Sequence, residues 1–256
     1  MDVPTLPPGA PTQQANDLLA QEGFVVLRQV LDAERVRALG AEVGAAFASL
    51  DGRKASLDPE DLRLLERLEM PVPQRGERFR LRVENYRVLD SQPLREIIRR
   101  WAGGEFCWHF PPMLRRQQPG VPGAALPYHQ DFAYTRHYPK FLVCWTPLSP
   151  CGEHAPGLEL VRGEHRQELA HGAGATWEFG FDPETAESYA ARGIAPVLEP
   201  GDVVLFTSLT PHRTYLTRDM TKTRLTIDFR AAAAADLTAE LRASRRFVDP
   251  TLLKFL

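Results

Sequence analysis

Residues 199–214 have the sequence EPGDVVLFTSLTPHRT, and the fold class follows from how this segment is built. Pro200 and Gly201 are turn residues, and the mostly apolar run that follows them predicts a short buried strand at 203–207. Similar apolar or alternating runs lie at 113–118, 141–145, 158–161 and 224–230. No helical pattern separates these runs, which argues against a doubly wound parallel sheet. The sequence therefore predicts an antiparallel sandwich or barrel flanked by helices.

The strand expected at 224–230 has the clearest alternation. Its apolar residues are Leu225, Ile227 and Phe229, and its polar residues are Arg224, Thr226, Asp228 and Arg230. Side chains two residues apart on a strand project to the same face. One face of this strand is therefore expected to pack against the core, and the other face is polar.

The first hundred residues are expected to be mostly helical. Residues 1–15 contain four prolines and few bulky apolar side chains, which predicts a mobile tail. A strand is expected at 24–27, and helices are expected from Asp32, over 59–69 and around 94–101. The predicted organisation is a tail (1–15) and a single domain (16–256), which comprises a helical part (16–105), a strand-rich core (106–230) and a C-terminal helix (231–256).

The overall charge excludes some classes of partner. The chain has 31 basic and 33 acidic residues, so no global positive field attracts it to nucleic acid or to an anionic membrane. No apolar run approaches the roughly 20 residues of a membrane span, and the N-terminus lacks a secretion-signal pattern. Cys107, Cys144 and Cys151 form no CxxC pair. We expect a cytoplasmic protein with reduced thiols and with neither nucleic-acid nor membrane partners.

A candidate metal site comes from one histidine with a nearby carboxylate. His129 is followed two residues later by Asp131, and on a strand both side chains would project to one face. His212 is the natural third member, because the strand at 203–207 would present it at the rim of a pocket. Two histidines and one carboxylate leave the opposite face of a metal open, as in non-haem iron(II) oxygenases. A hydrogen-bonded surface pair is the alternative for His129 and Asp131.

An arginine is the second requirement for such an enzyme. Oxidative decarboxylation of a 2-oxo acid is one source of the two electrons that an iron oxygenase needs beyond those from its substrate. The far carboxylate of this cosubstrate needs a buried, permanently charged partner, and arginine can bind it through two hydrogen bonds. Arg224 lies 12 residues after His212, on the polar strand face. Arg213, Arg218 and Arg230 compete for the role, and a solvent-facing position is the alternative.

Several segments, in this order along the chain, resemble the phytanoyl-CoA dioxygenase family of iron(II)- and 2-oxoglutarate-dependent oxygenases. The ordered set is more specific than any single segment, and with the start of the domain it covers residues 16 to 230. The segments are EGFVVL (22–27), YHQDF (128–132), LVCWTPL (142–148), PGLELV (156–161), GEH (163–165), EPGDVVLF (199–206), TPHRT (210–214) and TRLT (223–226).

The resemblance implies a mainly β fold with flanking helices, whose core is a double-stranded β-helix of the jelly-roll, cupin-like kind. It assigns the site residues as follows: iron(II) to His129, Asp131 and His212, the far carboxylate of 2-oxoglutarate to Arg224 and Thr214, and the lining of the cosubstrate pocket to Trp145 and Met113. For the last two and for Thr214, ordinary core or strand packing is the alternative.

The reaction implied is oxidation of an aliphatic C–H in a small molecule or an acyl- or carrier-bound metabolite. It would consume O2 and 2-oxoglutarate and release succinate and CO2. The carboxylate of Asp131 favours hydroxylation, since halogenating relatives replace it with a small residue. Two alternatives stay open: a cupin-like metal enzyme without 2-oxoglutarate, such as an isomerase or ring-cleaving dioxygenase, and a non-catalytic binding protein that keeps the fold.

The residues that choose the substrate are the least readable part of the sequence. The chain departs from the family pattern at 162–165 (RGEH) and at 216–217 (LT), and both departures concern loops near the substrate. The aromatic segment 171–195 could form a lid, and an excursion that packs its own aromatics is the alternative. The arginines at 75, 78, 80 and 82 are expected to form a solvated face with local ion pairs, and a face toward an anionic substrate is the alternative.

Overall fold

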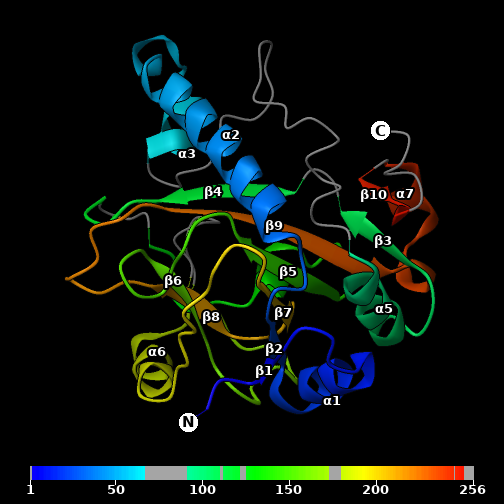
Figure 1. Ribbon diagram of the computed structural model, residues 1–256. Helices are drawn as coiled ribbons and strands as arrows, with labels where there is room; N and C mark the ends of the chain where they lie inside the picture. The colour runs from blue at the N-terminus through cyan, green and yellow to red at the C-terminus, as the bar shows by residue number, and fades with distance from the viewer. Residues whose placement is uncertain are drawn as a thin grey trace.

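The computed structural model describes residues 2–66, 91–109, 112–121, 125–172, 180–244 and 246–250. Two antiparallel sheets form its centre, and helices lie at the periphery (Figure 1). The strands are β1 (Thr5–Leu6), β2 (Phe24–Leu27), β3 (Phe106–His109), β4 (Met113–Gln117), β5 (Phe141–Pro147), β6 (Gly157–Leu160), β7 (Val203–Thr207), β8 (His212–Tyr215), β9 (Arg224–Ala233) and β10 (Phe247–Val248). The helices are α1 (Thr12–Glu22), α2 (Ala33–Asp51), α3 (Pro59–Glu66), α5 (Gln92–Trp101), α6 (Pro183–Ala190) and α7 (Ala239–Ala243), with short 3-10 turns at Lys54–Ser56, Asp131–Tyr134 and Ala234–Asp236.

The larger sheet has the order β1-β2-β7-β5-β9-β3-β10, and β4 pairs with β9 beside β3. All its neighbours are antiparallel except β1 and β2. The second sheet consists of β6 and β8, with Leu160 opposite His212. This arrangement confirms the two-layer antiparallel fold predicted from residues 106–230.

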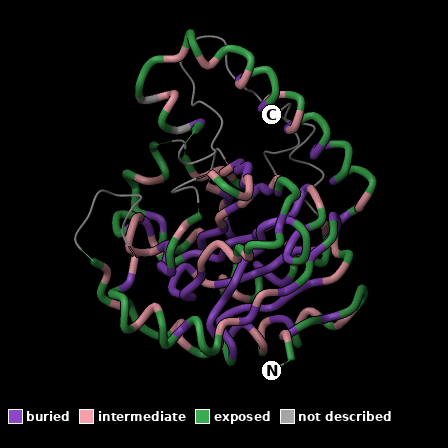
Figure 2. The backbone as a smooth tube through the Cα atoms, turned by 90° about the vertical axis from the view of Figure 1, so that its left-hand side faces the viewer, coloured by how far each residue is buried: buried purple, intermediate pink, exposed green. Residues whose placement is uncertain are grey.

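Helices α1, α2 and α5 pack on the outer face of the larger sheet. The Asp32 side chain caps α2 by accepting hydrogen bonds from the backbone N–H groups of Glu34 and Arg35. One stripe of α2, at 36, 39, 43 and 47, is buried against the sheet, as its spacing predicts. Gly40 allows this close approach, because an added Cβ would lie 2.5 Å from the Leu148 carbonyl oxygen. Buried residues concentrate in the strands, while the helices alternate between buried and exposed faces (Figure 2).

The inner face of the larger sheet packs against β6 and β8. Phe24, Val143 and Phe206 of the larger sheet share one apolar cluster with Leu158 and Leu160 of β6. The polar side chains of the inner face lie beyond this cluster, between the sheets, where they line a pocket. The polar face predicted for residues 224–230 is therefore turned into the molecule: Arg224 is only 3% exposed.

Both chain ends differ from the predictions. Residues 1–15 were expected to be a mobile tail, but Thr5 and Leu6 form β1 on β2, and α1 begins at Thr12. In the C-terminal part that was expected to be helical (231–256), the described helix is shorter than expected. Ala231–Ala233 continue β9 between β5 and β3, and only 239–243 are α-helical before β10. Strand partners on both sides outweigh the helix propensity of alanine here.

Some predictions fall partly or wholly outside the described residues. The helix expected at 59–69 is described as far as Glu66, and the arginines at 75–82 lie outside the described ranges. Within the described ranges, no helix combines the length and the apolar character that would be needed to cross a bilayer.

Candidate active site

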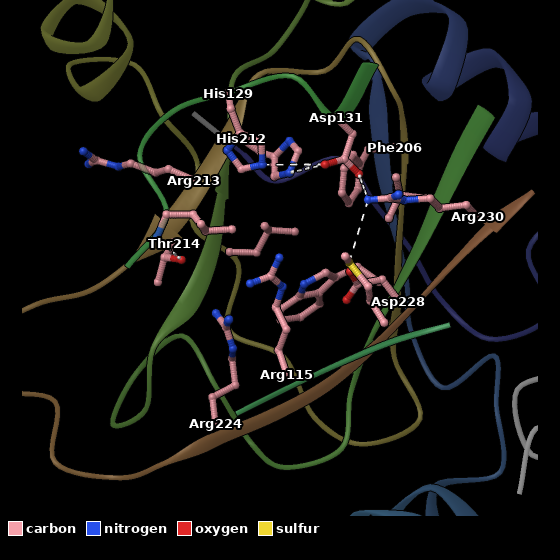
Figure 3. A pocket seen from close by; sticks show the side chains of 15 residues that line it. Arg115, His129, Asp131, Phe206, His212, Arg213, Thr214, Arg224, Asp228 and Arg230 are labelled. Atoms are coloured by element: carbon pink, nitrogen blue, oxygen red, sulfur yellow. Dashed lines mark hydrogen bonds and ion pairs between the residues drawn. The ribbon is translucent and has the colours of Figure 1, made fainter. Parts of the chain in front are cut away.

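The pocket between the sheets contains every residue that the sequence placed in the site (Figure 3). It is lined from β4, β5, β8 and β9 and from the segment before the 3-10 turn at 131–134. The seven predicted residues in its lining are Met113, His129, Asp131, Trp145, His212, Thr214 and Arg224. Residues from five separate segments of the sequence thus converge on one cavity.

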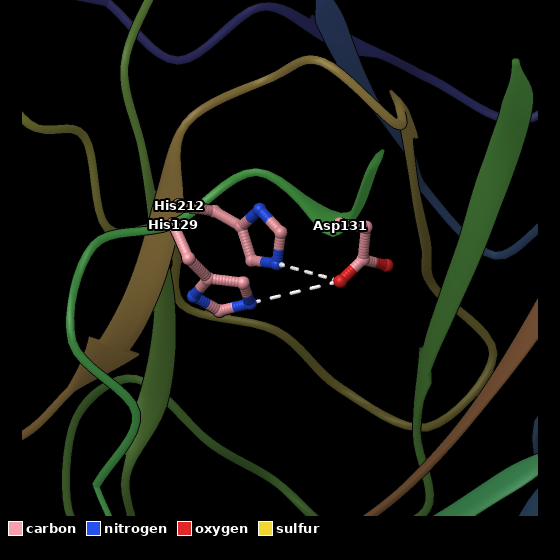
Figure 4. Close-up of side chains that lie close together, drawn as sticks. All are labelled: His129, Asp131 and His212. Atoms are coloured by element: carbon pink, nitrogen blue, oxygen red, sulfur yellow. Dashed lines mark ion pairs between the residues drawn. The ribbon is translucent and has the colours of Figure 1, made fainter. Parts of the chain in front are cut away.

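His129, Asp131 and His212 bring three metal-ligand atoms together at one end of this pocket (Figure 4). The Nε2 atoms of His129 and His212 lie 3.6 and 3.9 Å from Oδ1 of Asp131. Two atoms bound to one ion at about 2.1 Å and at a right angle would be roughly 3 Å apart, so a small closure suffices. The donor set matches the two-histidine, one-carboxylate group of non-haem iron sites.

Backbone carbonyls fix the proton position on both imidazoles. Nδ1 of His129 lies 2.7 Å from the Pro127 carbonyl oxygen, and Nδ1 of His212 lies 2.9 Å from that of Thr210. A carbonyl oxygen can only accept, so each Nδ1 must carry the proton. Each Nε2 then keeps its lone pair and faces Asp131, which is the state that a metal ion requires.

Asp131 is placed differently from the expectation. The sequence suggested that it would follow His129 along a strand. Instead, His129 forms an isolated bridge with His212, and Asp131 begins a 3-10 turn. The convergence of the two side chains therefore comes from the turn. Nη2 of Arg230 contacts the second carboxylate oxygen of Asp131 at 3.3 Å and leaves Oδ1 toward the histidines.

The charges around the triad favour the protonation states that bind a metal. Burial raises the pKa of Asp131, but the Arg230 guanidinium opposes this effect and the pKa lies well below its usual range. Burial lowers the pKa of His212 to about 3, and the neighbouring His129 adds to the lowering. Asp131 is thus ionised and His212 neutral at neutral pH.

Gln130 and His171 hold the HxD segment in place, a role that no sequence pattern predicted. The Gln130 side chain is fully buried, donates to the carbonyls of Gln167 and Leu209, and accepts from the Leu169 N–H. Its backbone N–H donates to Nε2 of His171 at 3.0 Å. These partners lie about 40 to 80 residues away, so no local motif could have revealed them.

A charged cluster stands behind the histidines on the smaller sheet. Arg213 binds the buried Glu159 carboxylate through two hydrogen bonds of 2.9 and 3.1 Å. Tyr128 donates its hydroxyl proton to the same carboxylate at 2.5 Å, and the Arg213 guanidinium lies over the Tyr128 ring. Arg213 therefore already serves a carboxylate of the protein, which removes it from the competition for the cosubstrate.

Arg224 and Thr214 occupy the other end of the pocket. Nη1 of Arg224 donates to the Gly157 carbonyl at 2.6 Å, and its guanidinium lies 5.3 Å from the centre of the Trp145 ring. The Thr214 hydroxyl accepts from the backbone N–H of Leu126 at 3.1 Å. Among the other competitors, Arg218 is exposed.

Two charged residues of this pocket were not singled out by the sequence. Arg115 of β4 is only 9% exposed, and Asp228 of β9 has a buried Oδ1 without a hydrogen-bond partner in the described ranges. Burial raises the pKa of Asp228 to about 6 despite Arg115 and Arg230. Arg115 also lines an adjoining chamber of about 120 Å³ with Tyr134 and Thr135. The alternation of β4 and β9 was the only signal for their common face.

The segment considered as a lid is described in part. Residues 173–179 lie outside the described ranges. In the described remainder, Phe181 and the α6 residue Tyr189 pack with Tyr128 and Val161 in a small apolar cluster. This packing agrees with the alternative that the segment buries its own aromatic residues.

Solved structures resemble the chain at the level of fold. They include EctD from S. alaskensis in its apoform (21% identity, 94% of this chain and 81% of that chain covered, TM-score 0.62) and with 2-oxoglutarate and 5-hydroxyectoine (22%, 92% and 78%, TM-score 0.62). AviO1 from Streptomyces viridochromogenes Tue57 is also similar (20%, 90% and 98%, TM-score 0.57). These likenesses confirm the double-stranded β-helix expected from the sequence.

Sequence comparison gives the family. No curated protein sequence matches the chain, but the family model for phytanoyl-CoA dioxygenase matches residues 19–218. That range includes the triad, Thr214 and most of the pocket lining, and it covers most of the chain. The chain therefore belongs to the phytanoyl-CoA dioxygenase family.

Proposed function

We propose that this protein is an iron(II)- and 2-oxoglutarate-dependent oxygenase that hydroxylates an aliphatic C–H of a small molecule or of an acyl- or carrier-bound metabolite. The observation that carries the proposal is the pair of Nε2 lone pairs that face the ionised Asp131, each fixed by a carbonyl on Nδ1. One EctD structure holds bound Fe and another holds 2-oxoglutarate, which supports the same pair of cofactors here.

The residues present fit this metal. His129, Asp131 and His212 would ligate iron(II) and leave the opposite coordination positions open. When bound together, iron(II) and 2-oxoglutarate supply the activation of O2, with succinate and CO2 as products and a hydroxyl delivered to the substrate C–H. The zinc alternative is weaker, because catalytic zinc more often takes three histidines or a histidine pair from one helix.

The chain's own residues provide binding, orientation and a dry site. Arg224 would bind the far carboxylate of 2-oxoglutarate, with the Thr214 hydroxyl as a second donor. Because Arg224 is buried and its Nη1 is held by the Gly157 carbonyl, its guanidinium is oriented before the cosubstrate arrives. Trp145 and Met113 would form the walls of this end of the pocket. Arg230 would hold Asp131 so that only Oδ1 is presented to the metal.

The test is an anaerobic titration of the metal-free protein with iron(II) and then with 2-oxoglutarate. We expect a weak visible charge-transfer band only when both are present, and a weaker band for Arg224→Ala at limiting 2-oxoglutarate. Arg218→Ala is the matched control, because this arginine is exposed and should leave the band unchanged. Iron binding without a band would overturn the cosubstrate assignment in favour of a cupin-like metal enzyme. Failure to bind iron would indicate a non-catalytic member of the fold.

A further inference from the structure

Arg115 is a buried cation whose charge is not matched by a direct partner. Its side chain comes from β4, beside Thr226 of β9, and projects between the sheets. It is 9% exposed, yet its guanidinium makes no hydrogen bond or ion pair with any residue in the described part of the chain. Burying an arginine without a partner is costly, and burial lowers the pKa of Arg115 for this reason. A cation kept under these conditions points to an anionic ligand.

The charges in the pocket leave room for one more anion. The lining contains the guanidinium groups of Arg115, Arg224 and Arg230, and the carboxylates of Asp131 and Asp228. Arg213 also lines the pocket, but its charge is balanced by Glu159, which does not line it. The three cations and two anions therefore leave one positive charge. Under the proposed function, iron(II) and the 2-oxoglutarate dianion cancel one another, and that positive charge remains.

Arg115 lines both the pocket that contains Arg224 and the adjoining chamber. It lines the adjoining chamber of about 120 Å³, together with Tyr134, Thr135, Met113 and Leu126. Arg224 and Thr214 line only the pocket, and Tyr134 and Thr135 line only the chamber. The residues that line both are Met113, Arg115, Leu126, His129, Asp131 and Arg230. The groups that act electrostatically on Arg115 are Asp228, Asp131, Arg230 and Tyr134, which also places it beside the triad.

The chamber offers a second polar group and an apolar wall. Burial and the nearby Asp131 raise the pKa of Tyr134, so its phenol stays neutral at neutral pH. Met113 and Leu126 form the apolar part of the lining. An anionic head group held by Arg115 would thus place an adjoining aliphatic carbon next to the metal ligands. The volume is below that of typical small-molecule sites, so the chamber suits a compact group.

We propose that Arg115, with Tyr134 beside it, is the binding site for an anionic group of the substrate, a carboxylate or a phosphonate-like group. That the bound molecule is the substrate rests on the proposed function; that the chamber binds an anion does not. Arg115 is thereby a specificity-determining residue. It selects a small acid whose oxidisable C–H lies a few bonds from the charge.

The experiment measures binding to the metal-free protein by calorimetry, without iron or 2-oxoglutarate, at constant ionic strength. The probes share one chain length: pentanoate, pentylphosphonate, 1-pentanol and pentylammonium. We expect the anions to bind and the alcohol and ammonium not to bind. Pentanoate and pentylphosphonate tell which anionic group fits better. Equal affinity for pentanol and the anions would overturn the proposal without any variant.

Variants then locate the anion. Arg115→Met should weaken anion binding by about 10- to 100-fold, the scale of a charge-assisted hydrogen-bonded pair. Arg115→Lys keeps the charge but loses the planar guanidinium, so its anion affinity should lie between those of the wild type and Arg115→Met. This variant replaces Arg115→Met if the latter fails to fold. The matched control is Arg116→Met on the same strand, because Arg116 pairs with Asp51 and does not line the chamber.

Arg224→Met separates the two ends of the site. If anion binding persists in Arg224→Met and is lost in Arg115→Met, the proposal holds; the reverse pattern overturns it. The iron and 2-oxoglutarate band is measured separately on the wild-type protein. Anion binding without the band would contradict only the proposed function, and the band without selective anion binding would contradict only the present inference.

Discussion

The two walls of the pocket differ in how completely their polar groups are bonded. On the wall built by the HxD segment and β8, both Nδ1 atoms of His129 and His212 face carbonyls, and every polar atom of the Gln130 side chain is engaged. On the wall built by β4 and β9, Oδ1 of Asp228 and the hydroxyl of Thr226 lack hydrogen-bond partners in the described ranges.

The difference indicates that the two walls of the pocket have different functions. A bonded wall holds its side chains in one geometry, which a metal centre requires. Polar groups that lack hydrogen-bond partners can acquire them from a bound ligand. While the pocket is empty, they lower the stability of the protein. Changes to the first wall should therefore abolish the chemistry, and changes to the second should alter ligand affinity and stability.

The largest effect is expected from His129→Ala. Loss of a residue that only supports a metal ligand costs about 10- to 100-fold in affinity or activity, so loss of a ligand itself should cost more than about 100-fold. Succinate formation in the presence of iron(II) and 2-oxoglutarate should fall below detection. His154→Ala is the control, because that imidazole is exposed on a loop. Wild-type activity in His129→Ala would contradict the metal-ligand assignment.

The next largest effect is expected from Arg224→Ala on the opposite side of the pocket. The concentration of 2-oxoglutarate that gives half-maximal turnover should rise by about 10- to 100-fold, because a buried charge-assisted pair is lost. The rate at saturating 2-oxoglutarate should change less, since the metal ligands are untouched. Arg224→Lys should fall between the two. A fall in the saturated rate alone would mean that Arg224 supports the metal wall instead.

These contrasts also explain what the sequence could predict. β7 and the start of β9 have the predicted bounds at Val203–Thr207 and Arg224, because their apolar runs end at turn residues. β8 was missed because His212–Tyr215 has no apolar pattern, and it is held by pairing with β6. At 231–233 alanines favour a helix locally, and strand partners from distant segments decide otherwise.

In the candidate site, too, local patterns were predictable and long-range contacts were not. Spacing and residue type predicted that His129, Asp131 and His212 converge on one site. In the structure their potential ligand atoms lie close together. The reason given for His129 and Asp131, a shared strand face, is replaced by a 3-10 turn. Arg115 and Gln130 were not predicted, because burial and partners far along the chain define their roles.

Gly193→Ala tests how far the stability of the wall that carries His129 and His212 depends on the cluster of Glu159, Tyr128 and Arg213. An added Cβ would meet the Glu159 carboxylate and lie 2.6 Å from the Tyr128 hydroxyl. The carboxylate would have to leave Tyr128 or Arg213, and breaking a buried pair costs about 3–5 kcal/mol. We expect a fall of this size in the free energy of unfolding, measured by urea denaturation.

Gly44→Ala is the matched control for this substitution. Gly44 lies within α2, and its added Cβ would meet only Leu225 Cδ1 at 3.5 Å, which is ordinary contact. Alanine is favoured over glycine in a helix by about 1 kcal/mol, so Gly44→Ala should be neutral or stabilising. Equal stability of Gly193→Ala and the wild type would show that the Glu159 cluster tolerates displacement.

The smallest effects on stability are expected at two aspartates. Like the two walls, they differ in how completely their polar atoms are hydrogen-bonded. The Asp202 carboxylate accepts from the Arg28 guanidinium, from the Gln29 N–H and side chain and from the Glu199 N–H. Among the residues that the structure describes, none forms a hydrogen bond with Oδ1 of Asp228. Asp202→Asn should therefore lower the free energy of unfolding by about 1.5–3 kcal/mol. Asp228→Asn should raise the same quantity for the metal-free protein, by about 1–2 kcal/mol at neutral pH.

The pH dependence gives the sign for Asp228. Its pKa is about 6 when folded and 3.8 as the reference value, so between these values the unfolded chain loses its proton while the folded protein keeps it. The native state then binds more protons, and stability falls as pH rises from about 4 to 6, with no further loss from this group above 6. Asp228→Asn should remove this fall, so its advantage over the wild type grows across that window and then stays constant. An advantage that shrinks with rising pH would mean that Arg115 and Arg230 already stabilise the Asp228 carboxylate in the empty site.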